Sequence, residues 1–223
     1  AYDFGNDFGA IDASNPEIIV ADVADMYMRS VDAGGVIVAM TGHRPGKLFD
    51  YNMKDPRYDI LRDELNQKLD ELGATTLITG MALGFDQLAA EVALDRGMRV
   101  VAAVPCENQD AKWIASSKRE YKNILDKVDD CVLVSDGTFT ENRDRGNDCM
   151  QERNKWMVDH ADSVIACWDG SRGGTGNCVN YAKSKGVAIE RINPKDIQAK
   201  YDAQKSKDVS DSLSKSSKKR VGV

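Results

Sequence analysis

The sequence lacks the features that would assign it to a membrane, a secreted or a metal-binding class. It contains no apolar run long enough to cross a bilayer, and its start has neither a secretion-signal pattern nor an arginine-rich amphipathic one. Its five cysteines are an odd number without a C-x-x-C pair, so neither a zinc site nor a complete disulfide framework is expected. These absences predict a cytoplasmic protein with no membrane partner and no metal.

Concentrated positive charge is also scarce. The formal net charge is −6, and the dense group of basic residues, Lys215–Arg220, lies at the end of the chain. A folded surface that neutralises a nucleic-acid backbone needs many lysines and arginines on one face. DNA association is therefore the least favoured function class, whereas a free nucleotide, which needs only local donors, is compatible with this charge.

Apolar runs of strand length alternate with amphipathic helical patterns along most of the chain. Strands are predicted at Val36–Met40, Thr76–Thr79, Arg99–Val104, Cys131–Ser135, Ser163–Trp168 and Val187–Ile192. Helices are predicted at Arg57–Leu72, Asp86–Arg96, Trp113–Lys127, Met150–His160 and Thr175–Lys185. Strands that are apolar on both faces pack in parallel sheets covered by helices. The pattern predicts a Rossmann-like, doubly wound α/β domain with a mainly parallel sheet.

Two flanking regions differ from this central domain, which we place at residues 36–194. Residues 1–35 are predicted to form an irregular arm and then a helix from Pro16 to Val31, whose apolar side covers the core edge or another subunit, so a homo-oligomer is expected. Residues 195–223 are rich in lysine and serine and have few large apolar side chains. They are predicted to form a mobile tail, with a basic interaction arm as the alternative.

Glycines and polar residues cluster directly after the predicted strands. In a parallel sheet these positions share one edge, where such sheets bind their ligands. The candidate ligand-binding residues are Thr41, Gly42, His43, Arg44, Gly80, Met81, Ala82, Gly84, Asp86, Glu107, Gln109, Trp113, Arg153, Asn154, Asp169, Gly170, Gly173, Gly174, Thr175 and Gly176.

The loop Trp168–Gly176, WDGSRGGTG, joins a strand to a helix. A glycine-rich turn in this place exposes backbone N–H groups at the positive end of a helix and favours a phosphate or carboxylate. Arg44 offers a second set of donors for such an anion. His43 is a hydrogen-bond partner or a proton carrier, and Asp86 is an N-cap, a partner of ribose hydroxyls, or both.

Other candidates have two interpretations each. Glu107, Gln109 and Trp113 are suited to reading and stacking on a base, although Trp113 at helical spacing from Tyr121 equally fits the core. Arg153 and Asn154, near a helix start, point into the site or line an exposed helix face. The polar stretch 136–148, with a glycine near each end, resembles a lid.

Several ordered motifs together resemble the YpsA/YoqJ-like branch of the SLOG superfamily, a Rossmann-like group related to the DprA and LOG proteins. The resemblance extends from Val36 to Pro194. Its segments are TGHRPGKL at Thr41–Leu48, TGMALGFDQLAAEVAL at Thr79–Leu94, VPCENQDAKW at Val104–Trp113, and ERNKWMVDHADSVIACWDGSRGGTGNCVNYAKSKG at Glu152–Gly186.

This resemblance implies a binding protein for a nucleotide or an ADP-ribose-like ligand, serving as a sensor or a sequestering protein, with no cofactor beyond that ligand. LOG enzymes cleave N-glycosidic bonds of nucleotides, so the alternative is a nucleotide N-glycosidic hydrolase or transferase. Those enzymes use a glutamate in a PGGxGTxxE motif, and the corresponding residue here is Cys178. A catalytic carboxylate would then come from Asp86, Glu91 or Glu107.

Overall fold

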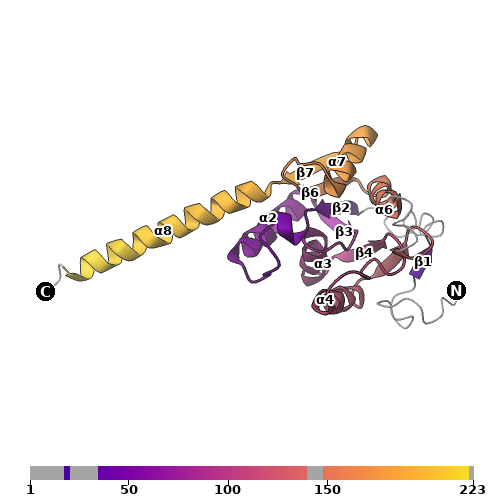
Figure 1. Cartoon of the computed structure of the whole chain (residues 1–223). Coiled ribbons are helices and arrows are strands. Elements are labelled where there is room, and N and C mark those ends of the chain that lie inside the picture. Colours follow the sequence, from indigo (N-terminus) through magenta and orange to yellow (C-terminus); the bar gives the residue numbers. More distant parts are fainter. Residues whose placement is uncertain (1–17, 21–34, 140–147, 221–223) are drawn as a thin grey trace.

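The chain forms a parallel β-sheet with helices on both faces (Figure 1). The computed structural model describes residues 18–20, 35–139 and 148–220, with side chains for 35–139 and 148–210. Its strands are β1 (Ile18–Val20), β2 (Val36–Gly42), β3 (Ala74–Thr79), β4 (Arg99–Val104), β5 (Asp130–Leu133), β6 (Ser163–Cys167) and β7 (Ala188–Ile192). Its helices are α2 (Pro56–Leu72), α3 (Phe85–Asp95), α4 (Ala115–Leu125), α6 (Asp148–Asp159), α7 (Gly174–Lys185), α8 (Pro194–Arg220) and the short 3-10 helix η1 (Pro45–Lys47). This arrangement confirms the predicted Rossmann-like class.

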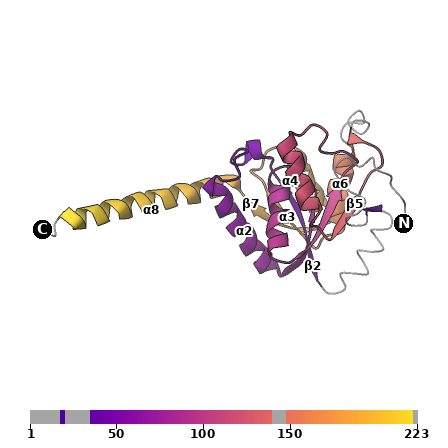
Figure 2. The same cartoon turned by 90° about the horizontal axis from the view of Figure 1, so that it is seen from below.

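Strands β2 to β6 are buried on both faces because alternate residues of each strand enter different cores. In β2, Val38 and Met40 join a core that also contains side chains from α2, α3 and α4, which lie together in Figure 2. Ala39, between them, faces a second core formed with α6 and α7. The strands therefore read as continuous apolar runs, which is why the sequence predicts them well.

The order of the strands changes direction at β2. The sheet order is β1-β5-β4-β3-β2-β6-β7, and every pairing between these strands is parallel. After β2 the chain builds one half of the sheet through β3, β4 and β5, and then crosses to place β6 on the other side of β2. The loops after β2 and β6 consequently leave toward opposite faces, and a ligand-binding crevice is expected at their carboxyl ends.

The start of the chain differs from its prediction. Residues Ile18–Val20 form strand β1, which pairs in parallel with β5, where the sequence predicts a helix from Pro16 to Val31. That prediction is wrong at these residues because a short Ile-Ile-Val run suits a buried strand as well as a helix, and pairing with β5 decides between them. The rest of the predicted helix, and the apolar side expected to mediate self-association, lie outside the described residues.

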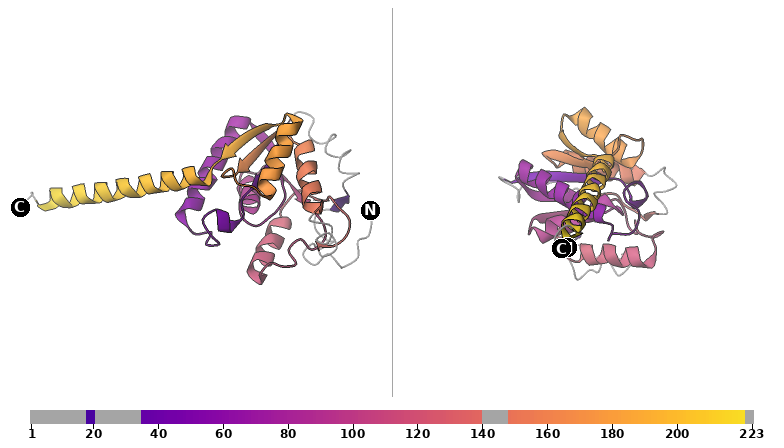
Figure 3. Two further views of the ribbon diagram at one scale, coloured as in Figure 1. Left: turned by 45° about the horizontal axis from the view of Figure 1, so that its top comes forward. Right: turned by 90° about the vertical axis from the view of Figure 1, so that its left-hand side faces the viewer.

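The end of the chain forms one helix, where the sequence predicts a mobile tail. α8 begins at Pro194, and its first turns lie on α2, where Ile197 is buried and Gln198 accepts a hydrogen bond from Arg57 at 2.6 Å. Beyond them the helix projects away from the α/β body, as Figures 1 and 3 show from different directions. Among the described residues, no helix combines the length and the apolar character needed to span a membrane.

The contact between α8 and the domain predicts an uneven effect of mutations along this helix. Ile197 is 1% exposed and Val209 is 54% exposed. Ile197→Ala should lower the free energy of unfolding by about 2 kcal/mol, because it removes buried methylene groups. Val209→Ala should change it by less than about 0.5 kcal/mol. Urea denaturation of both variants checks this, and equal effects at the two positions would contradict the described docking.

Candidate functional site

Three loops are hydrogen-bonded to one another at the carboxyl edge beside β2 and β6. The His43 amide donates to Cys167 O at 3.0 Å, which extends the pairing of β2 with β6 into the loop region. The Phe85 amide, at the start of α3, donates to His43 O at 3.2 Å. Thr175 in the first turn of α7 donates its hydroxyl proton to Gly42 O at 2.9 Å. The loops after β2, β3 and β6 therefore form one continuous structure.

A carboxylate organises the glycine-rich loop from within. Asp169 Oδ1 lies 2.7 Å from Nε2 of the buried His43 and accepts the Ser171 amide at 2.9 Å. Hydrogen bonds from the Ser171 side chain and amide, and then from His43, hold the pKa of Asp169 well below its usual range. Trp168 Nε1 donates to Ser171 O at 2.7 Å and closes the turn. Asp169 and His43 thus have structural partners within the loop.

The N-terminus of α7 faces open space. Gly173 precedes the helix with φ 148°, a conformation that favours glycine, and both Gly173 and Gly174 are exposed. A Cβ added at either position would meet no atom within 4 Å. The first turn of α7 contains no acidic side chain. Its backbone N–H groups and the positive end of the helix dipole are therefore available to an anion.

Arg153 occupies the interior of the site. It extends from α6 and is 6% exposed. Its guanidinium lies against Gly80 at the end of β3, so closely that a Cβ atom at position 80 would overlap Nη1 and Cζ. Its Nη1 is 3.9 Å from Asp86 Oδ2, too far for a hydrogen bond. Within the described part of the chain, Nε and Nη1 of Arg153 have no hydrogen-bond partner. This is a buried cation whose donors are incompletely used.

Asp86 connects the loops after β2 and β3. Its Oδ1 accepts the Gly42 amide at 3.1 Å and its Oδ2 accepts the Ala82 amide at 3.4 Å. Burial raises the pKa of Asp86 to about 6, although Arg153, the two amides and Arg44 act in the opposite direction. Gly84 has a φ of 101° and lets the chain turn into α3. A Cβ atom at this position would lie 2.6 Å from His43 O, so only glycine fits here.

Basic side chains that the sequence analysis did not select surround the glycine-rich loop. Lys47 Nζ lies 2.9 Å from Ser171 Oγ, and the Arg191 guanidinium lies 5.4 Å from the Trp168 ring and donates to Trp168 O. Arg172, inside the loop, is exposed. Arg191 lies within β7, one residue before its carboxyl end, so a search restricted to residues that follow the strands passes over it.

Comparison with known proteins assigns the chain to a family. The YpsA family model, described as the YspA SLOG family, matches residues 38–197. The chain belongs to this SLOG family. The SPbeta prophage-derived protein YoqJ of Bacillus subtilis is 32% identical over 164 residues, a match that covers 64% of this chain and 92% of YoqJ. A UPF0398 protein of Lactobacillus acidophilus is 27% identical over 140 residues, which cover 58% and 71% of the two chains.

A solved structure supports the fold. The X-ray structure of DNA processing protein A (DprA) from Streptococcus pneumoniae superposes with a TM-score of 0.50 and 19% identity. The superposition covers 71% of this chain and 50% of DprA, so the chain spans about half of that protein. At this identity the likeness concerns the Rossmann-like fold of the SLOG domain alone.

Several predicted site residues of this SLOG domain have contacts that belong to packing. Gln109 is buried and donates to the Tyr121 hydroxyl at 2.7 Å, and Trp113 packs edge-on against the Tyr121 ring with centroids 5.3 Å apart. These contacts favour the core interpretation of Trp113. Glu107 is held through its backbone, since its amide donates to Gly137 O at 3.1 Å and its carbonyl accepts the Phe139 amide at 2.8 Å. Residues 140–147 of the predicted lid lie outside the described chain.

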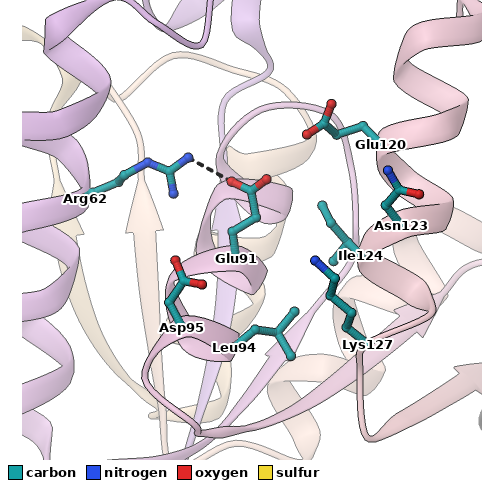
Figure 4. Close-up of a pocket in the computed structure, with 8 residues that line it drawn as sticks. All are labelled: Arg62, Glu91, Leu94, Asp95, Glu120, Asn123, Ile124 and Lys127. Carbon is teal, nitrogen blue, oxygen red and sulfur yellow. Dashed lines mark hydrogen bonds and ion pairs between the residues drawn. The ribbon is translucent and has the colours of Figure 1, made fainter.

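Glu91 lies apart from the other candidates. It projects from α3 into a groove between α2, α3 and α4, where Arg62 Nη2 donates to its Oε2 at 2.8 Å (Figure 4). Asp86, by contrast, lies at the first turn of the same helix, at the edge of the sheet. The groove side chains in Figure 4 include none of the residues around the glycine-rich loop. The structure therefore brings Asp86 to the predicted site and leaves Glu91 outside it.

Cys178 is the residue that the resemblance to the LOG motif aligns with its glutamate. Its side chain is 1% exposed in α7, and burial raises the pKa of its thiol to about 11. It is therefore a neutral thiol near pH 7.

Asn154, also buried, points from α6 to the start of α7, with Nδ2 3.5 Å from Gly174 O. Arg153 and Asn154 are thus both buried and do not line an exposed helix face, and their role in a site stays a prediction.

The raised pKa of Asp86 predicts a pH dependence of stability. A carboxyl whose pKa rises from 3.8 to about 6 on folding stabilises the protein below pH 4, and this contribution is lost as the pH rises through 6. The loss is on the order of 3 kcal/mol. Urea unfolding between pH 4 and pH 7 should show this decline in the wild type and not in Asp86→Asn. Asp169 and the other carboxylates are common to both proteins, so their contributions to the pH dependence cancel in this comparison. Parallel curves for the two proteins would therefore contradict the raised pKa of Asp86.

Proposed function

We propose that the chain binds a nucleotide or nucleotide-derived ligand at the edge of β2 and β6, with a phosphate group between Arg153 and the first turn of α7. The observation that carries this proposal is the buried Arg153 guanidinium, of which Nε and Nη1 have no hydrogen-bond partner among the described residues. Buried charges in proteins are normally paired and hydrogen-bonded, since an uncompensated one costs several kcal/mol. Phosphate oxygens would supply charged acceptors for these nitrogens.

The second support is the position of α7 relative to this arginine. The positive charge of Arg153 acts to lower the pKa of the Cys178 thiol, which lies in the second turn of α7. Asn154, the residue after Arg153 in α6, donates from Nδ2 to Gly174 O at 3.5 Å. The exposed Gly173 and Gly174 leave space in front of the first turn. An anion in that space would meet backbone N–H groups on one side and the guanidinium on the other.

The basic rim favours a ligand with more than one phosphate. Lys47, Arg172 and Arg191 lie around the same loop, outside the position proposed for the first phosphate. Each would interact with a second phosphate in a site where solvent screens it only in part. A diphosphate such as ADP or ADP-ribose is therefore expected to bind more tightly than AMP.

Asp86 is the proposed partner of the ribose, since each of its oxygens keeps a second lone pair, and Glu107 is the proposed partner of the base.

Replacing Arg153 with an apolar residue of similar length separates binding from folding. Arg153→Met should weaken binding of ADP or ADP-ribose about 10- to 100-fold, because it removes charge-assisted hydrogen bonds. Its effect on the free energy of unfolding has two opposing parts, because it removes an incompletely paired buried cation and also leaves the Asp86 carboxylate without its cationic neighbour 3.9 Å away. Calorimetric titration and urea denaturation measure the two effects, and Arg62→Met, which removes an arginine of the groove in Figure 4, is the matched control.

A second variant tests the other side of the phosphate position. Gly174→Asp should abolish binding, because it adds a negative charge at the exposed start of α7 where the new side chain meets no atom. Binding unchanged by both Arg153→Met and Gly174→Asp would overturn the proposed site. The panel includes a single-stranded oligonucleotide, since the similar DprA structure is of a DNA processing protein. Binding of this DNA in place of the free nucleotides would also overturn the proposal.

Hydrolysis of an N-glycosidic bond is the second candidate, and the environment of Asp86 favours it. A buried carboxyl with a pKa of about 6 is suited to donate a proton to a leaving base. If the protein is such an enzyme, incubation with AMP, ADP-ribose or NAD should release free base that chromatography detects. Asp86→Asn should then lose at least about 100-fold of this activity, and turnover that survives the substitution would exclude Asp86 as the acid.

A further inference from the structure

Two thiols lie against each other at the edge of the proposed phosphate site. Cys106 lies in the loop between β4 and α4, and Cys149 lies in the first turn of α6. Their sulfur atoms are 3.4 Å apart, and their side chains are 0% and 1% exposed. A disulfide bond needs a sulfur separation of about 2.05 Å, so closure requires an approach of little more than 1 Å shared by two side chains.

The pair is joined to Arg153 through α6. Cys149 and Arg153 are four residues apart in this helix, and residues at this spacing share one helix face. Burial and the hydrogen bond with Cys149 raise the pKa of the Cys106 thiol. The positive charge of Arg153 acts in the opposite direction. A bond from Cys149 to the β4–α4 loop would therefore hold the turn of α6 that precedes Arg153.

We propose that Cys106 and Cys149 form a reversible disulfide that fixes α6 to the β4–α4 loop and thereby tightens phosphate binding at Arg153. The part that concerns binding rests on the proposed function. The bond would hold Arg153 in the arrangement that the reduced structure already has, so less ordering is required when the ligand binds. We expect the affinity for ADP or ADP-ribose to rise about three- to tenfold on oxidation.

A hydroperoxide is the oxidant that the chemistry requires. One thiol is oxidised by hydrogen peroxide to a sulfenic acid, and one water is released. The sulfur of the second thiol then attacks the sulfenic sulfur, the S–O bond breaks, and the departing hydroxide takes the thiol proton as a second water. In total two thiols lose two hydrogen atoms and one peroxide becomes two waters. A small dithiol reverses the reaction by thiol–disulfide exchange.

Burial makes this pair slow to react and hard to reduce. Neither sulfur is exposed, and the raised pKa of Cys106 lowers its thiolate fraction near pH 7. Oxidation of the folded protein should therefore take minutes to hours. The other cysteines, Cys131, Cys167 and Cys178, are buried within β5, β6 and α7.

Counting the free thiols tests bond formation without any ligand. After hydrogen peroxide treatment, the protein is unfolded in an alkylating reagent and its mass is measured. Of the five cysteines, three should be alkylated, and peptide mapping should join Cys106 to Cys149 with a loss of about 2 Da. Cys149→Ser should form no such bond, whereas Cys178→Ser, a control at a buried cysteine outside the pair, should form it. Five alkylated thiols in the wild type, or a bond between other cysteines, would overturn the proposal.

Titration of the reduced and oxidised proteins with ADP or ADP-ribose then tests the effect on the site. Tighter binding by the oxidised wild type, reversed by dithiothreitol and absent in Cys149→Ser, is the expected result. A disulfide that forms without changing the affinity would overturn the regulation and leave the proposed function intact. A disulfide that forms in a protein binding no nucleotide in either state would instead contradict the proposed function.

Discussion

The seating of the Arg153 guanidinium against Gly80 is the contact on which the proposed site depends. A side chain at position 80 would occupy the place of the guanidinium, so a glycine at the end of β3 is what admits a buried arginine there. Asp86 lies 3.9 Å away and compensates part of the charge without forming a hydrogen bond. The protein thus holds a cation in its interior with donors to spare, and an incompletely paired buried charge of this kind destabilises the fold unless a ligand uses it.

The crossover of the chain at β2 explains why this arginine lies beside the glycine-rich loop. Because β6 follows β5 in the sequence and pairs with β2, α6 and α7 cover the same face of the sheet and place Arg153 near the start of α7. The hydrogen bonds of Asp169 with His43 and Ser171, and of Thr175 with Gly42 O, fix the loop to this edge before any ligand arrives. A pre-organised site of this kind loses less conformational entropy on binding.

The sequence predicts most of the sheet because strands β2 to β6 are largely apolar on both faces and are separated by helical patterns and turn residues. It fails at Ile18–Val20, where pairing with β5 decides the structure, and at α8, whose lysine, glutamine and alanine residues form a helix that is anchored by Ile197. It selects Arg153 but cannot show that Gly80 makes room for it, because that contact joins residues 73 positions apart. The sequence also cannot distinguish a core role of Trp113, in which it packs on Tyr121, from a role in stacking on a base, since both roles need the same side chain.

In the proposed site, a phosphate of the ligand completes the hydrogen bonding of Arg153. The arginine Nε–H signals in a ¹⁵N–¹H NMR spectrum report on this directly, with the signal that is absent in Arg153→Met assigned to this residue. During titration with ADP-ribose, the Arg153 signal should shift and reach saturation together with the calorimetric isotherm, while the Arg62 signal stays in place. A ligand that binds by calorimetry and leaves the Arg153 signal unchanged would contradict the claim.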